Sequence, residues 1–317
     1  MSRILLLVEL KGGNDGLNTV IPYADLRYRQ LRPRLGVARE RVLQLDEHVG
    51  LHEKLEPLME SWTARDLAIV QGVGYSSPNR SHFRSIEIWD TGSSASQTLN
   101  EGWIARALEH AKPARGAAVD GIVIDTNALP MMGPDLRTIV MQDAEKFLRQ
   151  AQSMQDKAPI DDGGNPALRH VLMVRREINA AAAALRDKLQ SAPGPAQGYV
   201  HDSLFGRELD LATRIIAAQV PVLAVKIALG GFDTHADQAP THERLLGVLA
   251  GGLATFRRNM IAAGRWDDVL VLTYSEFGRR AKQNASGGTD QGQSALFSGH
   301  CSASVSFRSR RICAAAA

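Results

Sequence analysis

Hydrophobic residues along the chain form short aliphatic runs, separated by stretches with helical spacing. The runs cover residues 4–10, 67–70, 121–124, 223–229 and 268–274. An aliphatic run without polar alternation is typical of a strand buried on both faces of a parallel sheet. Amphipathic spacing predicts helices over 51–64, 81–89, 103–110, 143–155, 168–190, 203–219 and 241–263, and residues 23–34 look irregular. The pattern predicts an α/β fold with a mostly parallel central sheet flanked by helices.

The composition changes near the end of the chain. From residue 294 onward Ser, Arg, Cys and Ala dominate without periodicity, and the only cysteines are Cys301 and Cys313. A frameshift or truncation explains this better than a natural disordered tail, because both cysteines occur only here. We expect one α/β domain over residues 1–292, with a helical cap or insertion at about 143–200, and an atypical, disordered tail over 293–317.

Charge and hydropathy exclude several classes of protein. The net charge is +3, from 37 basic and 34 acidic residues without a long block of one sign, so nucleic acid is not an expected partner. No apolar run approaches the roughly 20 residues of a membrane span. The first strand begins almost at Met1 and leaves no room for an export signal, so the chain as written is expected to be cytoplasmic.

The first aliphatic run ends in the turn Lys11-Gly12-Gly13-Asn14-Asp15-Gly16, in which Asp15 is the sole carboxylate. Ligands of open α/β sheets bind at the carboxyl ends of the strands. This position favours Asp15 as a metal ligand or polar anchor of a site. The alternative is that Asn14 or Asp15 caps a following helix.

Two later strands end in the same manner. Asp233 and His235 follow the run 223–229, and Glu276 follows the run 268–274. Carboxylates and an imidazole at one sheet edge suit a divalent metal such as zinc, manganese, calcium or magnesium. Each residue also has a plainer interpretation. Asp233 would cap the next helix, His235 would lie on a surface loop, and Glu276 would pair with Arg279 or Arg280.

Ser81 stands at the predicted start of a helix, where backbone N–H groups favour an anion. A hydroxyl there is a candidate nucleophile toward a phosphate or sulfate ester. The plainer interpretation makes Ser81 an N-cap and His82 a surface residue. A triad serine of an α/β-hydrolase is a weaker alternative, because no Gly-x-Ser-x-Gly elbow surrounds it.

Six motifs occur in an order that resembles the bacterial domain-of-unknown-function 1501 family (DUF1501), a sulfatase-like branch of the alkaline-phosphatase superfamily. The resemblance spans about residues 3 to 292. The motifs are VELKGGNDGLNTVIP (8–22), NRSHF (79–83), EGWIAR (101–106), FDTHADQ (232–238), TYSEFGRR (273–280) and NASGGTDQG (284–292).

The resemblance implies a site at the C-terminal edge of the sheet. By analogy with the superfamily, Asp15 is the first metal ligand, Ser81 the nucleophile, Asp233 and His235 a later metal-binding pair, and Glu276 the acid of the following strand. The expected function is a metal-dependent hydrolase with a small anionic ester of phosphate or sulfate as substrate. The alternative is a non-catalytic binding or secretion-associated member of the fold, or an inactive truncated remnant.

The chain departs from the family pattern in three places. Glu276-Phe277-Gly278 stands where superfamily enzymes usually carry Asp-His-Gly, and Gln291 replaces the histidine of the Gly-Thr-Asp-His-Gly that relatives usually show. A neutral amide is a poorer ligand for a transition metal than imidazole, which weakens a site that uses this position. Relatives also continue into further strands and commonly carry a twin-arginine export signal, which would make the protein periplasmic or exported if its true N-terminus has one.

Overall fold

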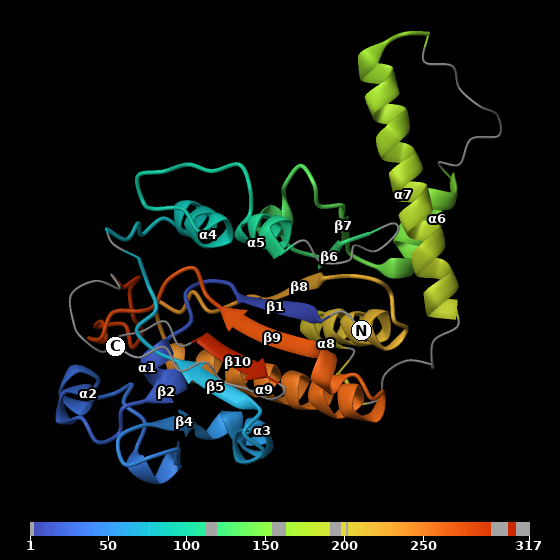
Figure 1. Ribbon diagram of the computed structural model, residues 1–317. Helices are drawn as coiled ribbons and strands as arrows, with labels where there is room; N and C mark the ends of the chain where they lie inside the picture. The colour runs from blue at the N-terminus through green and yellow to red at the C-terminus, as the bar shows by residue number, and fades with distance from the viewer. Residues whose placement is uncertain are drawn as a thin grey trace.

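A central sheet organises the protein (Figure 1). The computed structural model describes residues 3–75, 77–111, 119–153, 163–190, 198–200, 202–292 and 304–308. Within them, seven strands form this sheet in the order β5-β10-β9-β1-β8-β6-β7. The strands are β1 (Ile4–Leu10), β5 (Leu67–Val70), β6 (Gly121–Ile124), β7 (Thr138–Met141), β8 (Ala224–Leu229), β9 (Val269–Tyr274) and β10 (Ser304–Arg308).

The strand directions confirm the predicted α/β fold with a mostly parallel sheet. β1 pairs in parallel with both β8 and β9, and β6 pairs in parallel with β7 and β8. β10 is antiparallel to both of its neighbours, β5 and β9. Every aliphatic run singled out in the sequence forms a strand of this sheet.

Helices cover both faces of the sheet, which explains why β1 has no polar alternation (Figure 1). Leu6 and Val8 point into a large core shared with α8 (Leu204–Ala217) and α9 (Gln238–Ala262). Leu7 points to the opposite face, into a second core on the side of α4 (His82–Thr91) and α5 (Trp103–Ala111). A strand with an apolar core on each face has no position for a solvated side chain.

A second, smaller sheet follows β1 in the sequence. Its antiparallel strands β2 (Val20–Ile21), β3 (Val42–Gln44) and β4 (Gly50–His52) have the order β2-β4-β3. The predicted helix over 51–64 is wrong in its first half. Leu51 belongs to β4, a 3-10 helix covers Glu53–Leu58, and α3 covers only Met59–Thr63. Pro57 lies inside the 3-10 segment, and proline cannot donate the backbone hydrogen bond that a continuous α-helix needs there.

The irregular stretch predicted over 23–34 contains a short helix, α2 (Leu26–Leu31). The Asp25 side chain caps it by accepting a hydrogen bond of 2.9 Å from the backbone N–H of Arg27. The other short helices are α1 (Gly16–Thr19) and the 3-10 helices η1 (Arg39–Arg41), η3 (Leu129–Met131) and η4 (Trp266–Asp268).

The segment predicted as a cap contains α6 (Ala144–Ser153) and α7 (Pro166–Gln190). α7 packs on α6 and α8, and its far end projects away from the rest of the protein (Figure 1). Within the tail predicted to be disordered, residues Ser304–Arg308 form β10, whereas Cys301 and Cys313 lie outside the described residues. None of the described helices is both long and apolar enough to cross a membrane.

Candidate functional site

The carboxyl ends of β1, β8 and β9 meet at one edge of the sheet, as the sequence predicts. Gly12, directly after β1, has a φ of +110° and lies so close to Asp233 that a Cβ atom on it would collide with the Asp233 backbone nitrogen. Its N–H donates a hydrogen bond of 2.9 Å to Glu276 Oε1, after β9. Glycine is required at position 12 because a side chain would push these strand ends apart.

Glu276 contacts His82 at this edge. Glu276 is buried, and its Oε1 lies 2.9 Å from Nδ1 of His82, at the start of α4. Ser275 Oγ lies 3.2 Å from the other carboxylate oxygen. A carboxylate beside Nδ1 accepts a hydrogen bond whenever that nitrogen carries the proton, and this contact orients the ring. The ring also packs on Phe277, with 4.7 Å between the ring centroids.

A second imidazole, His235, has a matching environment. Its Nδ1 lies 3.5 Å from Asp290 Oδ1, and its Nε2 lies 2.9 Å from Asp233 Oδ1. The other oxygen of Asp233 lies 3.5 Å from Nε2 of His82. The side-chain amide of Gln291 is 3.3 Å from His82 Nε2 and 3.0 Å from His235 Nε2. Both imidazoles therefore direct Nε2 toward one point, with a carboxylate at each Nδ1.

Arg279 stabilises the ionised form of Asp233. Its buried guanidinium donates a hydrogen bond of 2.6 Å to Asp233 Oδ1 and another of 2.7 Å to the carbonyl of Gly13. Partial burial alone would raise the pKa of Asp233, but the hydrogen bond and charge of Arg279 outweigh it and lower that pKa. Arg279 thus pairs with Asp233, and not with Glu276 as the plainer interpretation of the sequence expected.

Asp15 has different partners. It occupies the N-cap position of α1, but its side chain does not cap that helix. Its buried carboxylate accepts a hydrogen bond of 2.6 Å from Arg32 and another from the amide of Gln238. Burial would raise the pKa of Asp15, but the Arg32 guanidinium holds it below its usual value. Its Oδ1 has no hydrogen-bond partner among the described residues.

The structure therefore divides the predicted ligands into two groups. Asp233 and His235 are in contact, and Glu276 joins them through His82. Asp15 lies in the neighbouring turn with Arg32 as its ion-pair partner. The role of these four residues as metal ligands stays a prediction.

Ser81 occupies the N-cap position of the ten-residue helix α4, yet its side chain makes no capping hydrogen bond. Its backbone N–H donates a hydrogen bond of 2.8 Å to Asn79 Oδ1, and its side chain is exposed. The plainer interpretation is therefore right about the N-cap position of Ser81, although the Ser81 side chain makes no capping hydrogen bond.

His82 is the site residue that the sequence analysis missed, because it was considered only as a surface neighbour of Ser81. Its side chain is 30% exposed, and its two ring nitrogens contact carboxylates that follow β8 and β9. The available signal was the NRSHF motif, in which His82 directly follows the candidate nucleophile.

The donor atoms of His82, His235 and Asp233 suit a divalent transition metal in their chemistry. Two imidazole nitrogens and one carboxylate form a typical zinc ligand set, and carboxylates at the far ring nitrogens are a common way to orient such ligands. In the structure His235 contacts Asp233, the Gln291 amide lies against both imidazole rings, and Arg279 donates a hydrogen bond to Asp233. Across the described residues, no three or more His, Cys, Asp or Glu side chains are arranged to hold a metal ion.

Comparisons with known proteins place the chain in a family. A family model described as "Protein of unknown function (DUF1501)" matches residues 42–299, which confirms the family expected from the motifs. None of the curated proteins matches the chain in sequence.

Among solved structures, the zinc complex of the C-terminal periplasmic domain of EcEptC from Escherichia coli has a TM-score of 0.43 and 10% identity, covering 97% of this chain and 73% of that one. The alkaline phosphatase of Thermus thermophilus has a TM-score of 0.36 and 18% identity, with coverages of 87% and 60%.

Proposed function

The chain belongs to the DUF1501 family, whose function is unknown, and we propose that it is a metal-dependent hydrolase of phosphate or sulfate esters. One observation carries this proposal. The Nε2 atoms of His82 and His235 lie 3.5 and 2.9 Å from the carboxylate oxygens of Asp233, at the carboxyl edge of the parallel sheet. Ligands bind at this edge in open α/β sheets.

His82, His235 and Asp233 would hold the metal between groups that now contact one another directly, at 3.5 Å from His82 Nε2 and 2.9 Å from His235 Nε2 to the Asp233 carboxylate. A divalent ion held at this position would act as a Lewis acid and offset charge on a phosphoryl or sulfuryl group. Glu276 and Asp290, at 2.9 and 3.5 Å from the Nδ1 atoms, keep both rings in the tautomer that presents Nε2. Arg279 orients Asp233 through its hydrogen bond of 2.6 Å.

Ser81 is the proposed nucleophile. Its hydroxyl is exposed and not used as a cap, and it stands at the positive end of α4, where an anionic ester is favoured. The exposed Arg80 adds a positive charge next to it. Attack by the Ser81 oxygen forms a bond to phosphorus or sulfur, the bond to the alcohol oxygen breaks, and the hydroxyl proton passes through solvent to the leaving alcohol. Water then releases the phosphate or sulfate from the serine.

Turnover of an aryl phosphate and an aryl sulfate by the metal-supplemented protein tests this function. We expect hydrolysis of one of them, loss of turnover in Ser81→Ala, and unchanged turnover in Ser96→Ala, a matched exposed serine in the loop after α4. Absence of turnover with zinc, manganese, calcium and magnesium would contradict the hydrolase. Full activity in Ser81→Ala would reject Ser81 as its nucleophile.

A second candidate is a non-catalytic anion-binding member of the fold. The observation that favours it is that buried guanidinium groups, those of Arg32 and Arg279, already neutralise Asp15 and Asp233. Carboxylates that are already paired with guanidinium groups need no metal ion to balance their charge. Calorimetric binding of inorganic phosphate or sulfate to the metal-free protein, together with absence of turnover, would support this candidate over the hydrolase.

A further inference from the structure

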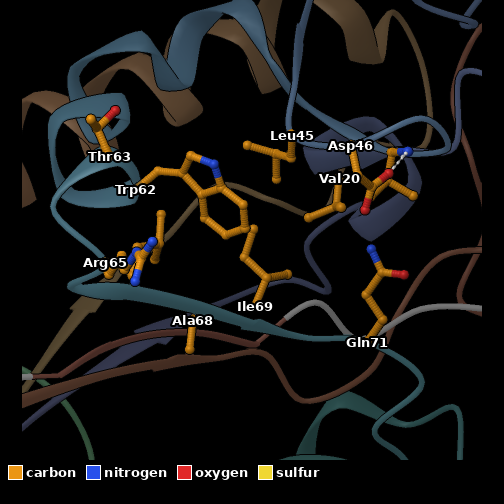
Figure 2. A pocket seen from close by; sticks show the side chains of 11 residues that line it. Val20, Leu45, Asp46, Trp62, Thr63, Arg65, Ala68, Ile69 and Gln71 are labelled. Carbon is orange, nitrogen blue, oxygen red and sulfur yellow. Dashed lines mark hydrogen bonds between the residues drawn. The ribbon is translucent and has the colours of Figure 1, made fainter. Parts of the chain in front are cut away.

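A groove with a volume of about 790 Å³ lies between β5 and the small sheet, and none of its residues belongs to the site described above. Its lining is mostly apolar and includes Leu45, Val49, Trp62 and Ile69. Figure 2 shows the Trp62 indole and the Ile69 side chain directed toward each other above β5. Arg65 lies near one end of this stretch and Gln71 near the other.

The charged side chains in and around the groove differ in the partners that they have. The Asp46 carboxylate accepts hydrogen bonds of 2.7 and 2.8 Å from the backbone N–H groups of His48 and Val49. Asp66, the neighbour of Arg65, forms an ion pair of 2.8 Å with Arg257. Arg65 itself is exposed, with a left-handed φ of 59°, and takes part in none of the ion pairs found among the described residues. The groove therefore combines an apolar wall with the exposed guanidinium of Arg65 at one end and the Asp46 carboxylate, held by backbone N–H groups, toward the other.

We propose that this groove binds an anionic amphiphile, a carboxylate on an unbranched aliphatic chain. The carboxylate would pair with Arg65, since guanidinium matches carboxylate geometry. The chain would follow β5 across Trp62 and Ile69, where it loses contact with water. The volume lies in the range of small-molecule sites, roughly 300–1,000 Å³. The four residues of β5 span roughly 13 Å, which suits a chain of medium length.

Calorimetric titration with decanoate, below its critical micelle concentration, tests the proposal, with decanol and decylammonium as uncharged and cationic probes. We expect saturable binding near one equivalent and the order decanoate, decanol, decylammonium from tightest to weakest. Each methylene removed should weaken binding about fourfold, so octanoate, with two fewer, should bind about sixteenfold more weakly than decanoate.

Variants separate the head group from the chain. Arg65→Gln should weaken decanoate about two- to fivefold and leave decanol unchanged, because an exposed ion pair contributes little. Ile69→Ser should weaken all three probes alike, and Arg29→Gln, an exposed arginine on α2, is the matched control. Absence of saturable binding, or equal affinity for decylammonium and decanoate, would overturn the proposal. So would a dimer, seen by sedimentation, that Ile69→Ser dissociates, because a second copy would then cover the groove.

Discussion

Asp90 offers the sharpest test of the buried electrostatics of this fold. It lies in α4 with no exposure to solvent, accepts a hydrogen bond of 2.7 Å from Tyr274 Oη, and has Lys226 Nζ 3.4 Å from its other oxygen. Lys226 is shared with the equally buried Glu9, 3.1 Å away. Together with the contact between His82 and Glu276, the Asp90 contact to Tyr274 holds both ends of α4 to the end of β9.

Burial raises the pKa of Asp90 from its ordinary value of 3.8 to about 6, although the charge of Lys226 opposes the rise. This shift of about 2 pH units corresponds to about 3 kcal/mol of folding free energy. The sign follows from proton binding. The folded state binds this proton more tightly than the unfolded state, so its stabilisation is complete below about pH 4. It is lost as the pH rises through about 6.

The assay is urea unfolding of the wild type and Asp90→Asn between pH 4 and pH 7. The amide that replaces the carboxyl group in this variant does not titrate, so the difference in the free energy of unfolding, wild type minus variant, should fall by about 2 kcal/mol across this range. Asp202→Asn, at an exposed aspartate, serves as the matched control. A difference that is constant, or that grows with pH, would refute the reasoning.

Three further predictions concern single positions. Arg32→Met leaves the buried carboxylate of Asp15 without its cation and should lower the free energy of unfolding by about 3–5 kcal/mol; a loss below about 1 kcal/mol in urea would argue against this. Burial raises the pKa of Glu208 from 4.5 to about 7, so the stability of wild type relative to Glu208→Gln should fall as the pH rises between these values. A stability difference between wild type and Glu208→Gln that does not change with pH would contradict this prediction. Gly12→Ala places a Cβ against Asp233 at a φ of +110° and should cost about 1–3 kcal/mol, a prediction that fails if the thermal midpoint does not move.

The sheet could be predicted from the sequence because its strands are short aliphatic runs with an apolar core on each face. Ile4–Leu10 and Ala224–Leu229 are buried along almost their whole length, so their composition alone indicates their place. The helix expected over 51–64 was wrong in its first half, because Leu51 has the periodicity of a helix but pairs as a strand in β4. Tertiary pairing overrides local periodicity in such short segments.

The edge carrying the site could be predicted, but the pairing of its charges could not. Glycine and acid after an aliphatic run indicate the carboxyl end of a strand. The partner of each acid is distant in sequence: Arg279 follows Asp233 by 46 positions, and Glu276 follows His82 by 194. Spacing carries no signal over such distances, so the sequence offered Arg279 or Arg280 only as alternative partners of Glu276, and His82 was missed.

Zinc titration of the metal-free protein tests most directly whether His82, Asp233 and His235 form one metal site. We predict one zinc equivalent in the wild type, loss of binding in His82→Ala and His235→Ala, and no change in His48→Ala, an exposed histidine that serves as control. Gln291→His, which adds an imidazole beside both rings, should bind zinc more tightly than the wild type. Zinc affinity that is the same in wild type, His82→Ala and Gln291→His would contradict the account.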